Sequence, residues 1–108
     1  MKSRIEIKKR NEISKERLKK LKVKTTKDKY YKLSYEITID ILNKIINENK
    51  DEKELYIELD DLKSKAIKLQ ESGEINKILK NNLKMRVYNW VLNNQNNVEI
   101  EWVPLKYK

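Results

Sequence analysis

The sequence predicts a mainly α-helical protein with a small β component. The chain of 108 residues contains one glycine and one proline, so it has little of the turn chemistry that all-β folds use. Apolar residues recur at helical spacing in several segments, and they alternate over two short stretches, residues 55–59 and 98–103. This length suits one domain, or one small domain with an extension.

The N-terminal part carries nearly all of the net charge. Residues 1–35 contain 14 Lys+Arg and 4 Asp+Glu, a net charge of +10, whereas the remaining 73 residues contain 12 basic and 13 acidic groups. Such an uneven charge attracts polyanions to one part of a molecule. We therefore divide the chain into a basic N-terminal extension, residues 1–30, and a domain, residues 31–108.

A helix is expected over residues 3–24 of the extension. One narrow stripe along this helix would carry Ile7, Ser14, Leu18 and Leu21. The hydrophobic stabilisation of the helix is expected to be weak, because Asn11 and Ser14 occupy two turns of the stripe where an apolar residue would pack better. We expect this helix to fray when free and to be ordered by phosphates or by an acidic partner.

The domain is expected to contain three helices and two short strands. Thr25 to Asp28 are predicted to form a boundary with an N-cap, and Gly73 is predicted to end a helix. Residues 31–41 also fit a strand by alternation, but the helical spacing continues further. The expected elements are a helix over 34–49, a strand over 55–59, a helix over 61–71, a helix over 74–94 with a bend at 81–82, and a strand over 98–103.

This order of elements resembles the winged-helix family of helix-turn-helix domains. The resemblance covers residues 34–104 and is carried by LYIEL, DDLKSKAIKLQ, the SG break, LKMRVYNWVLNN and VEIEWVP. It implies that the helix before the wing enters the major groove of DNA, with two paired strands beside it. The family has a two-stranded wing and this chain has one clear strand there, so any wing is truncated.

Two groups of residues are candidates for nucleic-acid contacts. Lysine outnumbers arginine by 22 to 4, which favours phosphate contacts over the reading of base edges. The phosphate-binding candidates of the extension are Lys8, Lys9, Arg10, Lys15, Arg17, Lys19, Lys20 and Lys22. The base-reading candidates share one face of the last helix: Asn82, Arg86, Asn89 and Asn93. Lys80 and Lys84 lie on a different sector of that helix and are candidates for phosphate contacts. Asparagine is abundant in the chain, so these amides also fit a solvated surface.

Other residues suggest weaker alternatives. Ile78, Met85 and Leu92 form a second apolar stripe on the last helix, which suggests either a homodimer contact or packing against the N-terminal helix. Tyr30 and Tyr31 stand among lysines and are candidates for stacking on bases.

Catalysis and membrane insertion find little support. The chain has no cysteine and no histidine, which removes thiolate sites, histidine ligands and histidine bases. Glu54, Glu58 and Asp60 would share a face of the predicted strand, but helix capping explains them more simply than a metal-dependent nuclease does. No apolar run approaches the roughly 20 residues of a membrane span, and no signal core follows the N-terminus. We expect a cytoplasmic protein that is not an enzyme, with no cofactor, metal, membrane partner or small-molecule substrate.

The predicted function is binding of nucleic acid, with double-stranded DNA favoured over RNA. The Lys-rich arm would contact phosphates, in a transcriptional regulator or an accessory protein of chromatin or replication. The alternative is a protein-interaction module, an inhibitor or an assembly subunit, which docks its basic helix on an acidic partner.

Overall fold

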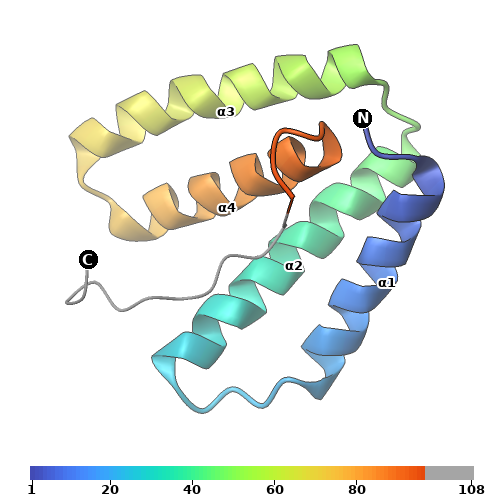
Figure 1. Cartoon of the computed structure of the whole chain (residues 1–108). Coiled ribbons are helices and arrows are strands. Elements are labelled where there is room, and N and C mark those ends of the chain that lie inside the picture. The colour runs from blue at the N-terminus through green and yellow to red at the C-terminus, as the bar shows by residue number, and fades with distance from the viewer. Residues whose placement is uncertain (97–108) are drawn as a thin grey trace.

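The computed structural model describes residues 1–96, which form four α-helices in two helical hairpins (Figure 1). The first hairpin is α1 (Arg4–Lys20) with α2 (Thr26–Asn47), and the second is α3 (Glu52–Ser72) with α4 (Ile75–Val91). α2 contacts both α1 and α4, and α3 packs on α4. Across the molecule the order is therefore α1, α2, α4, α3, and the predicted mainly α class is confirmed.

Local capping chemistry explains where three of the helices begin and where one ends. Ser3 and Glu6 form a capping box at α1, and Thr25 and Asp28 form one at α2, where the sequence predicted a cap. The Asp51 side chain accepts a hydrogen bond from the Glu54 N–H at 2.9 Å and starts α3. Gly73, with φ of 71°, ends α3 as predicted, because a left-handed residue there closes a helix at little cost.

The strand predicted over residues 55–59 is wrong, because this segment lies inside α3. Leu55, Leu59 and Leu62 are buried on one side of the helix, while Ile57 is 61% exposed. Over five residues, alternation and helical spacing both place Leu55 and Leu59 on one face. The cap at Asp51 decides between them, since it starts a helix just before the segment.

The winged-helix resemblance is also wrong. The described residues form four helices and no strand, whereas a wing is a β-hairpin. The helix predicted over 34–49 begins earlier, at Thr26, so the alternating residues 31–41 are helical. The strand predicted over 98–103 lies outside the described residues. The helix predicted over 74–94 corresponds to α4 and continues through Asn81 and Asn82.

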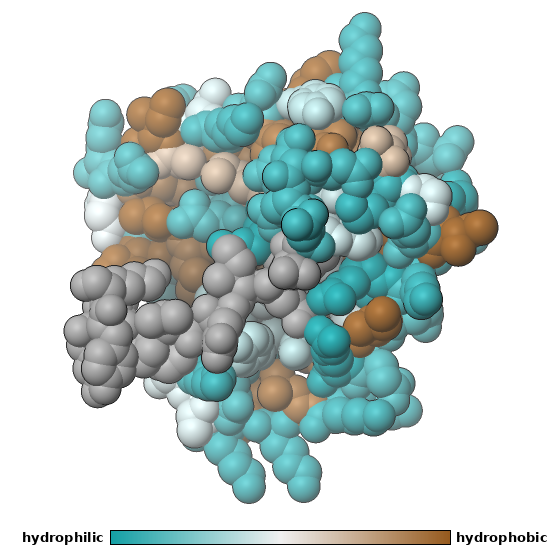
Figure 2. Space-filling model, viewed as in Figure 1, coloured by the Kyte–Doolittle hydropathy of each residue, from teal (hydrophilic) through white to brown (hydrophobic). Residues whose placement is uncertain are grey.

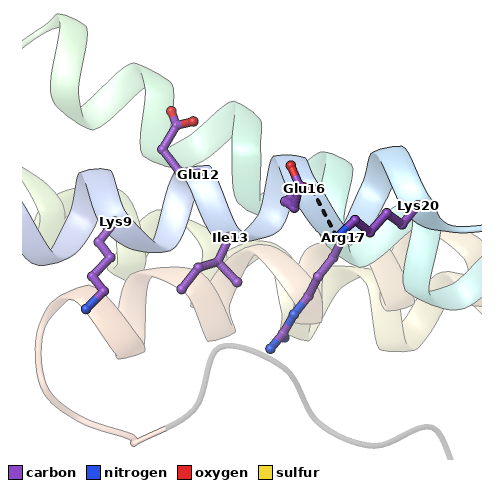
Figure 3. Close-up of a pocket in the computed structure, with 6 residues that line it drawn as sticks. All are labelled: Lys9, Glu12, Ile13, Glu16, Arg17 and Lys20. Carbon is purple, nitrogen blue, oxygen red and sulfur yellow. Dashed lines mark ion pairs between the residues drawn. The ribbon is translucent and has the colours of Figure 1, made fainter.

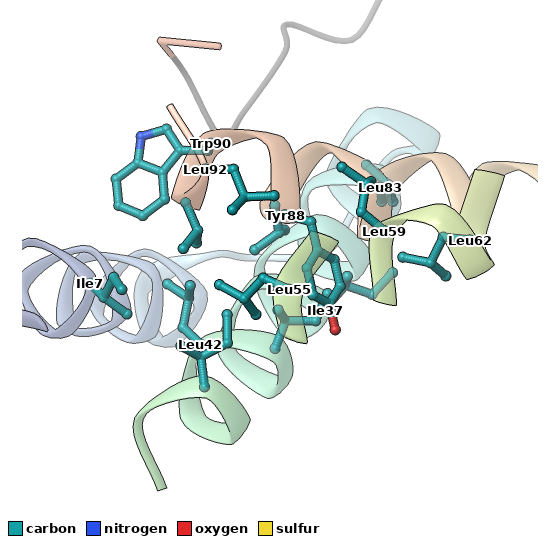
Figure 4. Packing of buried hydrophobic residues seen from close by; sticks show 14 residues of the cluster. Ile7, Ile37, Leu42, Leu55, Leu59, Leu62, Leu83, Tyr88, Trp90 and Leu92 are labelled. Atoms are coloured by element: carbon teal, nitrogen blue, oxygen red, sulfur yellow. The ribbon is translucent and has the colours of Figure 1, made fainter. Parts of the chain in front are cut away.

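The hydrophobic core lies where α2, α3 and α4 meet (Figure 4). Leu42, Leu55, Leu59, Val87 and Val91 are its most buried members. Leu92 is buried as well and Met85 packs against the cluster. Ile78, the third residue of the second apolar stripe, is half-buried and does not belong to this cluster. Packing within the chain thus covers part of the stripe, and the predicted dimer contact stays a prediction.

α1 is attached to α2 through small and polar side chains. Its buried residues are Ile7, Asn11 and Ser14, and Asn11 Nδ2 donates a hydrogen bond to Asn43 Oδ1 at 2.6 Å. Ser14 is fully buried, and its hydroxyl has no hydrogen-bond partner among the described residues. The weak stripe that the sequence predicted is therefore the face that α1 buries.

The N-terminal residues satisfy carbonyl groups at the ends of other helices. The backbone N–H of Lys2 donates to Val91 O at 2.6 Å, and its ammonium lies 5.0 Å from the centre of the Trp90 ring. The Arg4 guanidinium donates to Asn49 Oδ1 at 2.9 Å and to Ile46 O at 3.3 Å. Helix C-termini carry unpaired carbonyls and a partial negative charge, so both cations stabilise them. Residues 2–4 thereby join α1 to the ends of α2 and α4.

Glu58 connects three parts of the structure. Its carboxylate pairs with the ammonium of Lys50, which precedes α3, and accepts a hydrogen bond from the Tyr88 hydroxyl of α4 at 2.8 Å. The Lys50 side chain is 10% exposed. The hydrogen bond to Glu58 raises the pKa of Lys50 above its ordinary value of 10.5. Burial, and then the bond to Glu58, raises the pKa of Tyr88 above 10.0.

We predict that Glu58→Gln destabilises the fold by about 1–3 kcal/mol at neutral pH, because the Lys50 ammonium stays buried without its counter-ion. Raised pKa values mean that the stabilising contributions of Lys50 and Tyr88 are fully present below the unfolded-state pKa and are lost as the pH rises above it. In urea unfolding, the gap between wild type and variant should therefore shrink above about pH 10. A constant gap from roughly pH 8 to 11 would contradict this role.

Candidate nucleic-acid interface

The turn end of the first hairpin concentrates the positive charge of the protein. Residues 15–32 comprise the end of α1, the connection and the start of α2, and we call them the basic tip. The basic tip holds nine Lys+Arg and two Asp+Glu, a net charge of +7, which leaves 17 basic and 15 acidic groups, or +2, for the rest of the chain. Its basic residues are all exposed: Lys15, Arg17, Lys19, Lys20, Lys22, Lys24, Lys27, Lys29 and Lys32. In the view of Figures 1 and 2 the basic tip lies at the bottom of the molecule, where Figure 2 shows hydrophilic side chains extending outward.

Asp28 holds the turn of the basic tip. Its carboxylate accepts hydrogen bonds from the backbone N–H of Lys24 at 2.9 Å and of Thr25 at 3.0 Å. These hydrogen bonds lower the pKa of Asp28 below its ordinary value, and the bond from Lys24 contributes most. The carboxylate therefore stays ionised at neutral pH and is already engaged with the backbone. The other acid, Glu16, forms an ion pair with Lys20 at 3.2 Å.

The outer face of α1 extends the basic surface away from the tip. Figure 3 shows Lys9, Ile13 and Arg17 along one side of the helix and Glu12 and Glu16 along the other; with Lys20, these residues line a surface groove. Exposed ion pairs within one helix, such as Lys15 with Glu12 at 3.6 Å, contribute little to stability. Their lysines are thus readily recruited by a stronger anion.

The predicted phosphate-binding residues of the extension all lie on α1 or directly after it. Arg10 is half-buried. The exposed members of the set are Lys8, Lys9, Lys15, Arg17, Lys19, Lys20 and Lys22. The predicted boundary between residues 30 and 31 lies inside α2, which has lysines on both sides of it. The division into an extension, residues 1–30, and a domain, residues 31–108, stays a prediction.

The second half of the basic tip was not predicted from the sequence. Lys24, Lys27, Lys29 and Lys32 are absent from the predicted set, which stops at Lys22. The hairpin places these four lysines at the same end of the molecule as the last turn of α1 (Figure 1). The available signal was the charge count, which stays high through residue 35.

Two tyrosines of the basic tip, Tyr30 and Tyr31, pack against each other, and Tyr31 also packs on Tyr35 of the next helical turn. Tyr31 stacks on Tyr35 with 6.3 Å between ring centres and meets Tyr30 edge-on at 5.4 Å. The Lys27 ammonium lies 5.9 Å from the centre of the Tyr31 ring. All three rings are half-buried. Their stacking on bases stays a prediction.

The base-reading candidates do not all share one helix face as predicted, because α4 ends at Val91 and Asn93 follows it with a φ of 63°. Some of the candidates are also engaged within the chain. Asn82 is exposed and Arg86 is half-buried. Asn89 Oδ1 accepts a hydrogen bond from Asn94, and Asn93 Oδ1 accepts one from Lys2. Pairing with adenine uses both the oxygen and the nitrogen of an amide, so base reading would have to break these bonds. Lys80 and Lys84 are exposed, and the roles predicted for all six residues stay predictions.

The carboxylates considered for metal binding do not converge. Glu58 bonds to Lys50 and Tyr88, whereas Asp60 lies on the exposed side of α3. Residues 1–96 contain no group of three acidic, histidine or cysteine residues arranged to hold a metal ion. None of the described helices combines the length and the apolar character needed to cross a bilayer.

No protein-family model, curated protein or solved structure matches this chain.

Proposed function

We propose that this protein binds nucleic acid, double-stranded DNA in particular, by contacting phosphates with its basic tip. One observation carries the proposal: nine exposed lysine and arginine side chains lie on the ends of α1 and α2 and on the connection between them, with a local net charge of +7. Phosphate contacts supply most of the affinity of sequence-independent nucleic-acid binding. The basic tip has the composition for that task.

Lysine chemistry and charge density favour a duplex. Eight of the nine basic residues of the tip are lysines, which act as flexible point charges and suit phosphate oxygens in many orientations. Double-stranded DNA presents one charge per roughly 1.7 Å of its axis and releases more counterions per contact than a single strand does. A compact cluster of cations therefore gains most from the duplex.

The fold fixes the backbone from which these flexible side chains extend. α1 and α2 hold the tip between two helices, with the connection closed by the Thr25 and Asp28 capping box. Less conformational entropy is lost on binding when the groups that make contact are already placed. Repulsion among the tip charges is present in the free protein, and phosphates would relieve it.

We predict that replacing two tip lysines, Lys19→Gln with Lys22→Gln, weakens binding to a short DNA duplex. The plot of log association constant against log salt concentration should become shallower by about 2, because each lost phosphate contact removes about 0.9 from the slope. Fluorescence anisotropy titrations at several salt concentrations measure both quantities. Substitution is preferable to deletion, since α1 contributes Ile7 to the core.

The control for this prediction is Lys44→Gln with Lys63→Gln, which removes the same charge at exposed positions outside the tip. Equal slopes and affinities for the two double variants would show that net charge, and not the basic tip, governs binding. Single-stranded DNA and duplex RNA of equal length test the preference for duplex DNA. Displacement of DNA by poly-glutamate at equal charge concentration would favour the acidic-partner alternative instead.

We further predict that Lys19→Gln with Lys22→Gln leaves the stability of the free protein within about 0.5 kcal/mol of wild type at low salt. Lys19 follows Lys15 by one turn, and such a like-charge pair destabilises a helix by about 0.2–0.5 kcal/mol. Lys19 also lies in the last turn of α1, where a cation stabilises the partial negative charge of the helix end by a similar amount. Thermal unfolding followed by circular dichroism should therefore show nearly the same midpoint for variant and wild type. A clearly lower midpoint would mean that these lysines serve the fold.

A further inference from the structure

The outer face of α3 carries a stripe with the spacing of a coiled-coil seam. Six residues recur at alternating intervals of four and three, opposite the buried Leu55, Leu59 and Leu62. They are Lys53, Ile57, Asp60, Ser64, Ile67 and Glu71, and all are exposed. Ile57 is 61% and Ile67 65% exposed, so this face of the helix carries two isoleucines that the rest of the described chain leaves largely uncovered.

This stripe is self-complementary when its direction is reversed. Its members form three pairs, each pair equally distant in sequence from Leu62. Lys53 pairs with Glu71, and the two side chains carry opposite charges. Ile57 corresponds to Ile67, both apolar, and Asp60 to Ser64, an acceptor with a donor.

We propose that the partner of this face is a second copy of the chain, with the two α3 helices packed antiparallel about a twofold axis near Leu62. In a twofold interface the same patch meets itself, so each of the three pairs forms twice. Ile57 of each copy would cover Ile67 of the other and remove four isoleucine side chains from water. No side-chain hydrogen bond or ion pair within residues 1–96 engages Lys53, Asp60, Ser64 or Glu71.

The distribution of charge along α3 favours the antiparallel arrangement. The acidic residues Asp60 and Asp61 precede the midpoint and the basic residues Lys63, Lys65 and Lys68 follow it. Antiparallel helices place the acidic half of one copy beside the basic half of the other. In a parallel pair, each charged residue of α3 would face the same residue of the other copy, so like charges would repel along the whole helix. One helix pair is a small interface, so we expect a dimer that forms reversibly as protein concentration rises.

A charge-swap series tests the proposal by sedimentation equilibrium. Lys53→Glu alone and Glu71→Lys alone each turn two attractive pairs per dimer into repulsive ones, and each should raise the dimer Kd about tenfold at low salt. Combining Lys53→Glu with Glu71→Lys exchanges the charges and should restore dimerisation. A parallel dimer would not be rescued, because like charges would still face each other.

The apolar part of the interface is tested with a matched pair of variants. Ile57→Ser should raise the dimer Kd by about tenfold or more, whereas Ile5→Ser, at a 79% exposed position on α1, should leave it unchanged. Both positions are exposed, so circular dichroism should show the same thermal midpoint for the two dilute variants. A wild-type chain that stays monomeric at all concentrations, or a double charge swap that does not dimerise, would overturn the proposal.

Discussion

The structure depends on holding two positively charged segments together. α1 and the start of α2 share the basic tip, with its net charge of +7, and their mutual repulsion opposes the hairpin. Ile7 and the Asn11–Asn43 hydrogen bond hold α1 along its length, while Lys2 and Arg4 bind the carbonyl ends of α4 and α2. Several contacts of modest strength, spread over one helix, together overcome the repulsion.

This arrangement separates the residues that attach α1 to the rest of the protein from those that we propose bind a ligand. Near the N-terminus, the Lys2 backbone N–H and the Arg4 guanidinium donate to carbonyls at helix ends, and the Lys2 ammonium donates to Asn93 Oδ1. The lysines of the basic tip lie at the opposite end of α1, where few acidic groups compete for them. A ligand rich in phosphate would act on the part of the chain that repulsion destabilises, so binding and folding would support each other.

Two helix ends followed from the sequence because single residues determine them, and the buried face of α1 followed from the spacing of its residues. Thr25 with Asp28, and Gly73, act through local backbone geometry that the residue type alone indicates. The burial of Ser14 followed from the spacing of its stripe. The second half of the basic tip did not follow, because it depends on two segments meeting across a turn. The hydrogen bonds that engage Asn89 and Asn93 likewise depend on how the chain ends meet.

The error at residues 55–59 and the proposed dimer face have one origin in Ile57. A helix that buries one side normally shows polar residues on the other, and its apolar period is then close to 3.6. Ile57 is apolar but lies outside, between the buried Leu55 and Leu59, so the local period becomes two and a strand is predicted. The pattern was therefore informative although the assignment was wrong. It reflects a helix with apolar residues on two opposite sides, one packed on α4 and the other exposed; the proposed dimer would cover the exposed side.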